Sequence, residues 1–330
     1  MALESFLTNN LAPMLVQEAE EFLDSQDTAH PFQFPQWADP GSRFVLLREG
    51  RKIRWLGTFS VYAPLGRKMP WIRVAMANRG PVCDDRKLWE AATDELAKNL
   101  RRERVAYLEV SPEWIQQSTE RDRNFLNNSE WRSLDIQRAT LRLDLTRSAD
   151  EIFANFSKTT RYEVRRAERL GAAVSPATSD AEIEEFARLY EKLAARKGFA
   201  ADSSERLQRQ IHWLIHAESR GALLLARTDN VVRGGAVIAR AGRRCWYIWG
   251  ASGKEQNANV GHILQWKALQ WAKAHGCTEY DFGGYTPGAT SGPAWFKAGF
   301  GGTEVRFVPP HRRIIRPTSY RIFSLLSGMR

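Results

Sequence analysis

The same order of predicted elements occurs twice along the chain, and this repeat restricts the fold more than any other feature. Each copy has two strands joined by a tight turn, a third strand, a helix and a final strand. In the first half these are 43–48, 53–61, 71–77, 86–101 and 104–110; in the second half they are 221–228, 231–240, 243–250, 260–274 and 278–282. One constant offset relates Leu96 to Leu269 and Tyr107 to Tyr280. A repeat of one unit predicts two related domains.

Strands interleaved with helices predict an α/β fold in which helices lie on the faces of mixed sheets. The length of 330 residues suits two domains of roughly 150 residues. We place the first domain at 1–145 and the second at 146–310, because LRLDLT ends a strand and Ser148 begins the next helix. We expect the tail, 311–330, to pack on the first domain. Two further amphipathic helices, 180–197 and 203–219, belong to the second domain.

Composition excludes several classes of protein. The N-terminal residues have neither a basic, apolar signal sequence nor an Arg-rich transit peptide, and no apolar run reaches the roughly 20 residues that cross a bilayer. We therefore expect a cytoplasmic protein. Three widely spaced cysteines, Cys83, Cys245 and Cys277, predict buried, reduced thiols. The net charge of +10 favours a polyanionic partner: nucleic acid, nucleotide phosphates or an anionic membrane surface. A merely solvated basic surface is the alternative.

The segment 157–170, SKTTRYEVRRAERL, predicts a strongly basic helix capped by Ser157. Helical spacing places its cations on one face, with an aromatic residue nearby: Lys158, Arg161, Tyr162, Arg165 and Arg169. Cations in a first turn oppose the helix dipole, so they favour a phosphate-binding role over helix stability. The alternative is a solvated face in which Glu163 and Glu168 pair with arginines of the same helix.

The segment 280–302 surrounds one cation, Lys297, with glycines and aromatic residues. Asp281 ends a predicted strand, at the edge where open α/β sheets bind their ligands. A short helix over 291–300 carries Lys297 beside Phe296 and Phe300. Burying an ammonium among aromatic rings is costly unless its charge is used. Lys297 is therefore the leading candidate for a catalytic group.

Two other patterns indicate less. The loop 256–261 resembles the pyrophosphate loop of acyl-CoA N-acyltransferases, but Asn259 replaces its first glycine. His212 and His216 share one side of a predicted helix, but no HExxH motif or third ligand accompanies them. We therefore predict neither a metal site nor a bound cofactor.

Several segments together resemble the Fem aminoacyltransferases, which build the interpeptide bridges of peptidoglycan. They are RGPV at 79–82, SKTTRYEVRRAERLGAAV at 157–174, YIWGAS at 247–252, LQWKALQWAKAHGCTEYDFGG at 264–284 and WFKAGFGG at 295–302. The resemblance spans about residues 40–310 and implies two tandem domains of the N-acetyltransferase fold. It also implies transfer of an amino acid from aminoacyl-tRNA to a stem-peptide amine of a UDP-linked or lipid-linked precursor. The long coiled-coil arm of some members is absent.

The resemblance assigns a role to each group. Lys297 matches the lysine that stabilises the tetrahedral intermediate, and basic and tyrosine residues of the second domain hold the precursor phosphates. We expect the substrates to contact Lys158, Arg161, Tyr162, Arg165, Arg206, Tyr247, Trp249, Tyr285 and Phe296. Asp281 is the nearest carboxylate to serve as base, although the leaving ribose oxygen is an alternative.

Two other functions remain open at this point. An acyl-CoA-dependent N-acyltransferase of the same fold would use a thioester donor. A non-catalytic protein that binds RNA or a membrane surface would instead use the basic, partly apolar tail around Tyr320, Phe323 and Leu325.

Overall fold

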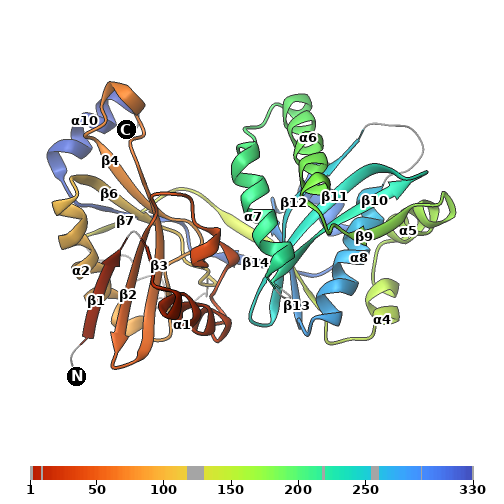
Figure 1. Ribbon diagram of the computed structural model, residues 1–330, viewed down its shortest axis with the longest axis horizontal. Helices are drawn as coiled ribbons and strands as arrows, with labels where there is room; N and C mark the ends of the chain where they lie inside the picture. Colours follow the sequence, from red (N-terminus) through yellow and green to blue (C-terminus); the bar gives the residue numbers. More distant parts are fainter. Residues whose placement is uncertain are drawn as a thin grey trace. The chain divides into compact units, whose positions relative to one another are not determined.

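The computed structural model describes residues 3–8, 10–116, 130–217, 220–253, 260–290 and 292–328 (Figure 1). The chain divides into two compact units. Residues 1–138 and 306–330 form the first unit, and residues 139–305 form the second. None of the helices in the described ranges is long and apolar enough to cross a bilayer.

A mixed sheet in the order β1-β2-β3-β4-β6-β15-β7 forms the centre of the first unit, with β5 paired to β3. Its strands are β1 (Leu3–Thr8), β2 (Arg43–Glu49), β3 (Lys52–Tyr62), β4 (Arg73–Ala77), β5 (Val82–Cys83), β6 (Val105–Val110), β7 (Trp131–Ser133) and β15 (His311–Ile314). Its helices are α1 (Pro13–Asp24), α2 (Trp89–Arg102) and α10 (Pro317–Ser327), with 3₁₀ turns at Pro31–Gln33, Pro35–Trp37, Gly66–Lys68 and Arg86–Leu88.

The second unit has a seven-stranded sheet in the order β9-β10-β11-β12-β13-β8-β14. Its strands are β8 (Arg138–Asp144), β9 (Ala173–Pro176), β10 (Gly221–Thr228), β11 (Val231–Ala241), β12 (Arg244–Ser252), β13 (Glu279–Gly284) and β14 (Thr303–Phe307). Its helices are α4 (Ala149–Ala154), α5 (Lys158–Arg169), α6 (Asp180–Lys197), α7 (Ser204–His216), α8 (Val260–Ala274) and α9 (Gly292–Ala298). Figure 1 shows α6 and α7 on one side of this sheet and α5 and α8 on the other.

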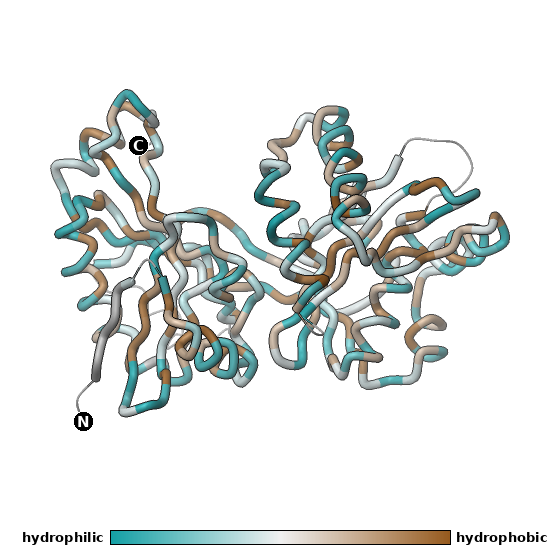
Figure 2. The backbone as a smooth tube through the Cα atoms, viewed as in Figure 1, coloured by the Kyte–Doolittle hydropathy of each residue, from teal (hydrophilic) through white to brown (hydrophobic). Residues whose placement is uncertain are grey.

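The mixed α/β architecture and the internal repeat are confirmed. In each sheet one parallel pair, β4 with β6 or β12 with β13, follows three antiparallel strands. The helix that connects the parallel pair, α2 or α8, packs on the sheet. Apolar residues of Figure 2 concentrate on these central strands, whereas much of α6 and α7 is hydrophilic. The sequence pattern therefore identified the repeated element correctly.

The strand β8 belongs to a different sheet from the one that the predicted domain boundary implies. The boundary predicted after residue 145 would assign β8 to the first domain, but β8 pairs with β13 in the second sheet. In the first sheet β15 holds the equivalent place beside β6. The apolar pattern of 141–145 specifies a strand but does not specify its partner. In the described part of the tail, α10 packs on β6, and Phe323 contacts Tyr107 there.

The RGPV motif has a structural role in the first unit. An ideal Cβ on Gly80 would lie 2.3 Å from the buried Gln33 side chain, so only glycine fits there. Arg79 donates to Glu113 at 2.8 Å, and Arg138 forms a second ion pair with the same carboxylate at 2.5 Å. Burial disfavours ionised Glu113, but the charges of Arg79, His30 and Arg138 outweigh burial and lower its pKa to about 2.

Candidate active site

The parallel strands β12 and β13 pair along only part of their length. The pairing register runs from Arg244 with Glu279 to Trp246 with Asp281. On its other edge β12 has an irregularity, because Val237 pairs with Trp249 while the next residue of β11 pairs with Tyr247. Such a bulge redirects side chains and is common beside active sites. The candidate site lies here, at the carboxyl end of β13, as expected for an open α/β sheet.

Lys297 is buried at this end of the sheet. Lys297 lies on α9 and is 9% exposed, and no other lysine among the described residues is buried. Nζ donates to the Gly284 carbonyl at 2.6 Å and lies 5.9 Å from the centre of the Tyr247 ring. Burial, with a further contribution from Tyr190, raises the pKa of Tyr247 to about 12, so this phenol is neutral at physiological pH. A fixed ammonium therefore faces a carbonyl and an aromatic ring.

The glycines that follow Lys297 permit close packing. An ideal Cβ on Gly299 would lie 2.4 Å from Oγ1 of Thr160 in α5. The Gly299 carbonyl accepts a hydrogen bond from the Ser157 amide at 2.8 Å. Gly302 has φ +105°, and a Cβ there would lie 2.8 Å from the Arg142 carbonyl. The two motifs that stood out in the sequence, the basic helix and the FKAGFGG segment, are therefore in contact.

Asp281 has a strongly hydrogen-bonded carboxylate. Its exposure is 2%. Oδ1 accepts from the Thr140 hydroxyl and from the Gly283 amide, the latter at 2.8 Å, and Oδ2 accepts from Arg142 Nε at 3.1 Å. These donors already occupy the oxygens of the carboxylate, so it is poorly placed to take a proton from a substrate. Asp281 is better explained as the residue that fastens β13 to β8.

The predicted cations of α5 lie in different surroundings. Ser157 caps the helix as expected, with its hydroxyl accepting from the Thr160 amide. Lys158 and Arg165 are exposed, and Arg165 lies over the Phe153 ring at 5.4 Å. Arg161 donates to the carbonyls of Ala154 and Phe156, just after α4. The first-turn position of Arg161 thus has a structural explanation that its spacing alone did not reveal.

The remaining side chains of the basic helix partly fit the alternative interpretation, a solvated face with ion pairs within the helix. Arg166 pairs with Glu163 at 3.6 Å, as a solvated face predicts. Tyr162 is 56% exposed and lies under the guanidinium of Arg169. The exposed cations of α5 therefore amount to a basic surface beside α9 rather than an enclosed phosphate site.

Arg206 and Trp249 meet at one carboxylate. Both contact Asp202, which precedes α7: Arg206 through an ion pair, and the Trp249 indole through a hydrogen bond of 3.1 Å. Burial and Asp202 raise the pKa of Tyr190, and Tyr190 in turn contributes to the raised pKa of Tyr247. Arg206 and Trp249 thus form a polar group that Tyr190 connects to the Lys297 region.

Comparisons with known proteins identify what this chain is similar to. A family model described as acetyltransferase (GNAT) domain matches residues 154–297. The UDP-N-acetylmuramoylpentapeptide-lysine N(6)-alanyltransferase of Weissella viridescens is 24% identical over 294 residues, which are 82% of this chain and 84% of that protein. The lipid II:glycine glycyltransferase of Staphylococcus saprophyticus is 39% identical over 57 residues, only 17% of this chain and 14% of that protein.

Solved structures show the same fold. The crystal structure of FemX has a TM-score of 0.80 at 17% identity, covering 98% of this chain and 99% of that one. This chain therefore has the fold of FemX. A tandem GNAT protein from the clavulanic acid biosynthesis pathway has a lower TM-score of 0.58 at 13% identity, covering 96% of this chain and 99% of that one. The fold is therefore that of tandem N-acetyltransferase-like domains.

Sequence reasoning missed one buried group of this protein. His262, in the first turn of α8, is 5% exposed and packs against Phe296 at 4.8 Å and Phe300 at 5.8 Å. Burial lowers the pKa of His262, although the charge of Glu163 acts in the opposite direction. The lowered pKa favours the neutral imidazole. Among the described residues its Nδ1 has no hydrogen-bond partner. The only sequence signal was its place at the start of a helix that faces Phe296.

The other predicted positions have the following surroundings. Tyr285 and Phe296 are partly buried against the core of the second unit. The predicted pyrophosphate loop falls mostly on 254–259, and Ser291 begins the predicted short helix; these positions lie outside the described residues. All three cysteines are buried, as expected.

Proposed function

We propose that this protein is a Fem-type transferase that moves an amino acid from aminoacyl-tRNA to a side-chain amine on the peptide stem of a UDP-linked or lipid-linked peptidoglycan precursor. Two relatives with matching segments are named for the transfer of alanine or glycine, to a muramoylpentapeptide lysine or to lipid II. The single observation that supports the chemistry best is the buried ammonium of Lys297 at the end of β13.

The reaction needs stabilisation of an oxyanion more than it needs a nucleophilic side chain. The amine nitrogen attacks the ester carbonyl carbon, and the carbonyl oxygen gains a negative charge in the tetrahedral intermediate. A preorganised donor in a dry site lowers the energy of that charge, and losing one such donor typically costs about 10²–10³ in kcat. In our proposal the Lys297 ammonium is that donor.

The proton balance of the proposed reaction does not need a carboxylate base. When the intermediate collapses, the C–O bond to the tRNA ribose breaks, the new C–N bond remains, and the leaving ribose oxygen takes up the proton that the amine loses. Because the Asp281 carboxylate already accepts from Thr140, Gly283 and Arg142, we assign it a positioning role instead. Of the two routes for the proton, we favour the ribose oxygen.

We assign substrate binding to the basic and aromatic groups around Lys297. The exposed cations Lys158 and Arg165 on α5 suit the phosphates of a precursor or a tRNA end. Tyr247, Tyr285 and Phe296 supply the apolar walls beside the ammonium, and Arg206 and Trp249 contribute a second polar group. The net charge of +10 favours association with both polyanions.

A lipid-linked acceptor would require contact with a membrane surface, and α10 offers a suitable face. Ile322, Leu325 and Leu326 follow helical spacing and are 41%, 83% and 55% exposed, with the exposed Arg321 beside them. The loop after β3, which carries exposed Arg67 and Lys68, packs through Leu65 and Met69 on the same apolar cluster as α10. Exposed leucines next to cations fit an anionic bilayer. We therefore propose a cytoplasmic enzyme that binds the inner membrane face peripherally.

Donor choice is the test that separates this proposal from the acyl-CoA alternative. Purified protein is incubated with a UDP-linked and, separately, a lipid-linked pentapeptide precursor and either labelled aminoacyl-tRNA or labelled acetyl-CoA, and the product is analysed by mass spectrometry. We expect transfer from aminoacyl-tRNA that RNase abolishes. Transfer from the thioester alone would replace the proposal with the acyl-CoA alternative, and transfer from neither would favour a non-catalytic protein.

A further inference from the structure

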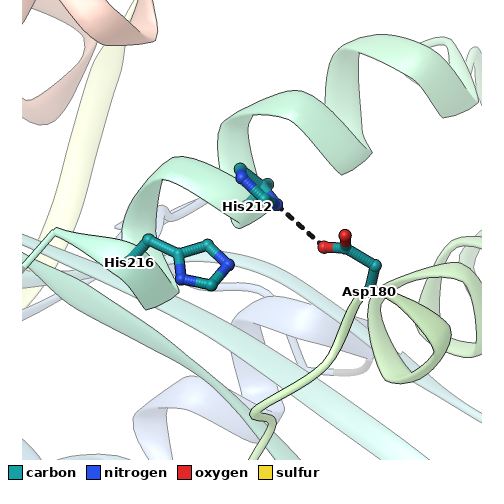
Figure 3. A group of neighbouring side chains, drawn as sticks. All are labelled: Asp180, His212 and His216. Carbon is teal, nitrogen blue, oxygen red and sulfur yellow. Dashed lines mark hydrogen bonds and ion pairs between the residues drawn. The ribbon is translucent and has the colours of Figure 1, made fainter.

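A group of three metal-ligand side chains lies on the α6 and α7 helices of the second unit (Figure 3). His212 and His216 stand four residues apart on α7, and their ring centres are 4.3 Å apart. Asp180, the first residue of α6, accepts or shares a hydrogen bond with Nδ1 of His212 at 2.8 Å. One ligand atom from each of the three residues lies within 4.8 Å of the others, and all three residues are exposed.

The sequence argument against a metal site was that the two histidines lacked a third ligand. The structure supplies one from a different helix, 32 positions earlier in the chain. No spacing rule connects Asp180 with His212, because only the packing of α6 against α7 brings them together. The N-terminal position of Asp180 is itself favourable, since a carboxylate in the first turn complements the helix dipole.

The types of ligand restrict the cation. Two imidazole nitrogens with one carboxylate oxygen suit Zn²⁺, and also Ni²⁺ or Cu²⁺, whereas Mg²⁺ and Ca²⁺ prefer oxygen ligands throughout. Zinc binds such atoms at about 2.0–2.2 Å, so its ligand atoms lie roughly 3–4 Å apart. Small side-chain rotations therefore bring this group, which already spans less than 5 Å, into coordination.

A simple ion pair explains only part of the arrangement. An exposed contact between His212 and Asp180 contributes little to stability, and it gives no reason for the position of His216. The ring of His216 lies beside the ring of His212, with ring centres 4.3 Å apart, so one cation can reach both imidazoles. His216 also ends α7, where the helix dipole favours positive charge.

Because of these contacts, we propose that Asp180, His212 and His216 bind a divalent transition-metal cation of the zinc type, which fastens the open end of the α6–α7 pair. Residues 198–203 connect the other end of this pair, and Asp202 there contacts Arg206 and Trp249. The cation would hold the two helices that carry Tyr190 and Arg206. It has no role in the acyl-transfer step, so the inference stands independently of the proposed function.

Calorimetric titration of the full-length, metal-stripped protein with ZnCl₂ tests the site, with MgCl₂ as the contrasting cation. We expect about one equivalent of zinc to bind, and no magnesium. His216→Gln should weaken zinc binding at least about tenfold, because even outer-shell changes cost about 10–100-fold. Glu205→Gln changes an exposed carboxylate at the opposite end of α7 and is the matched control.

Thermal unfolding supplies the second measurement. Zinc should raise the Tm of the parent protein and of Glu205→Gln but not that of His216→Gln, since only a cation bound to the folded state stabilises it. Without zinc, the variants should melt close to the parent because the substituted side chains are exposed. Absence of zinc binding by the parent, or equal affinity of His216→Gln and Glu205→Gln, would overturn the proposal.

Discussion

Replacing Lys297 with methionine tests the proposed chemistry at a single atom. Methionine retains most of the aliphatic volume of lysine but removes the ammonium that donates to the Gly284 carbonyl at 2.6 Å. If this group stabilises the oxyanion, kcat for transfer from aminoacyl-tRNA should fall by about 10²–10³, equivalent to about 2.7–4 kcal/mol of transition-state stabilisation. The free energy of unfolding should fall by only about 1.5–3 kcal/mol, the usual contribution of a hydrogen bond to a charged group, because the contact with Gly284 is only partly buried.

The matched control is Lys273→Met. Lys273 Nζ donates to the carbonyls of Leu145 at 2.8 Å and Arg147 at 2.7 Å, so its contacts resemble those of Lys297 but lie at the C-terminal end of α8. We expect this variant to lose a similar amount of stability in a denaturant titration and to keep a kcat close to that of the parent. The reasoning fails if Lys297→Met retains more than about a tenth of the parental kcat, a loss below about 1.4 kcal/mol, or if both variants lose activity equally.

Three further predictions follow from packing and charge. Gly299→Ala should lower the free energy of unfolding by about 1–3 kcal/mol and reduce activity, because the new Cβ would overlap Oγ1 of Thr160. Denaturant titration should show that adding Thr160→Ala partly restores stability. A single Gly299→Ala variant as stable as the parent would contradict the packing. Glu113→Gln should cost about 3–5 kcal/mol at pH 7, because it leaves two largely buried arginines without their shared carboxylate. Since the folded pKa of Glu113 is lowered to about 2 from an ordinary 4.5, its stabilisation should disappear as pH falls through this window, and a variant with the parental acid profile would refute this. The lowered pKa of His262 means that the folded state resists protonation, so the free energy of unfolding should decline below pH 6.5. Urea titrations at pH 7.5 and pH 5.5 should show a smaller decline for His262→Gln than for the parent. An equal decline would refute the lowered pKa of His262.

Periodicity and capping revealed most of the local structure because these signals lie within short segments. The limits of α6 and α8 and the cap at Ser157 agree with their sequence predictions. The place of β8 in the second sheet was not predictable, because a strand's apolar pattern does not identify the strand it pairs with.

The same distinction applies to the candidate site. Isolation of Lys297 among aromatic residues and glycines was visible in the sequence, and its burial agrees with that expectation. The interactions that decide the roles of the other residues join distant segments: Asp281 with Arg142, Arg206 and Trp249 with Asp202, and Asp180 with His212. No local pattern encodes such contacts. Without its contact to Arg142, Asp281 could be interpreted from the sequence only as a carboxylate at the end of a strand, which is why it was proposed as a base.

Muropeptide composition tests the central claim most directly. Peptidoglycan stems are analysed by mass spectrometry in a strain that lacks this protein and in the same strain carrying the parent, Lys297→Met or Lys273→Met. The account predicts that an amino acid is missing from the stem side-chain amine in the deletion strain and with Lys297→Met, and is restored by the parent and by Lys273→Met. Identical stems in all four strains would contradict it.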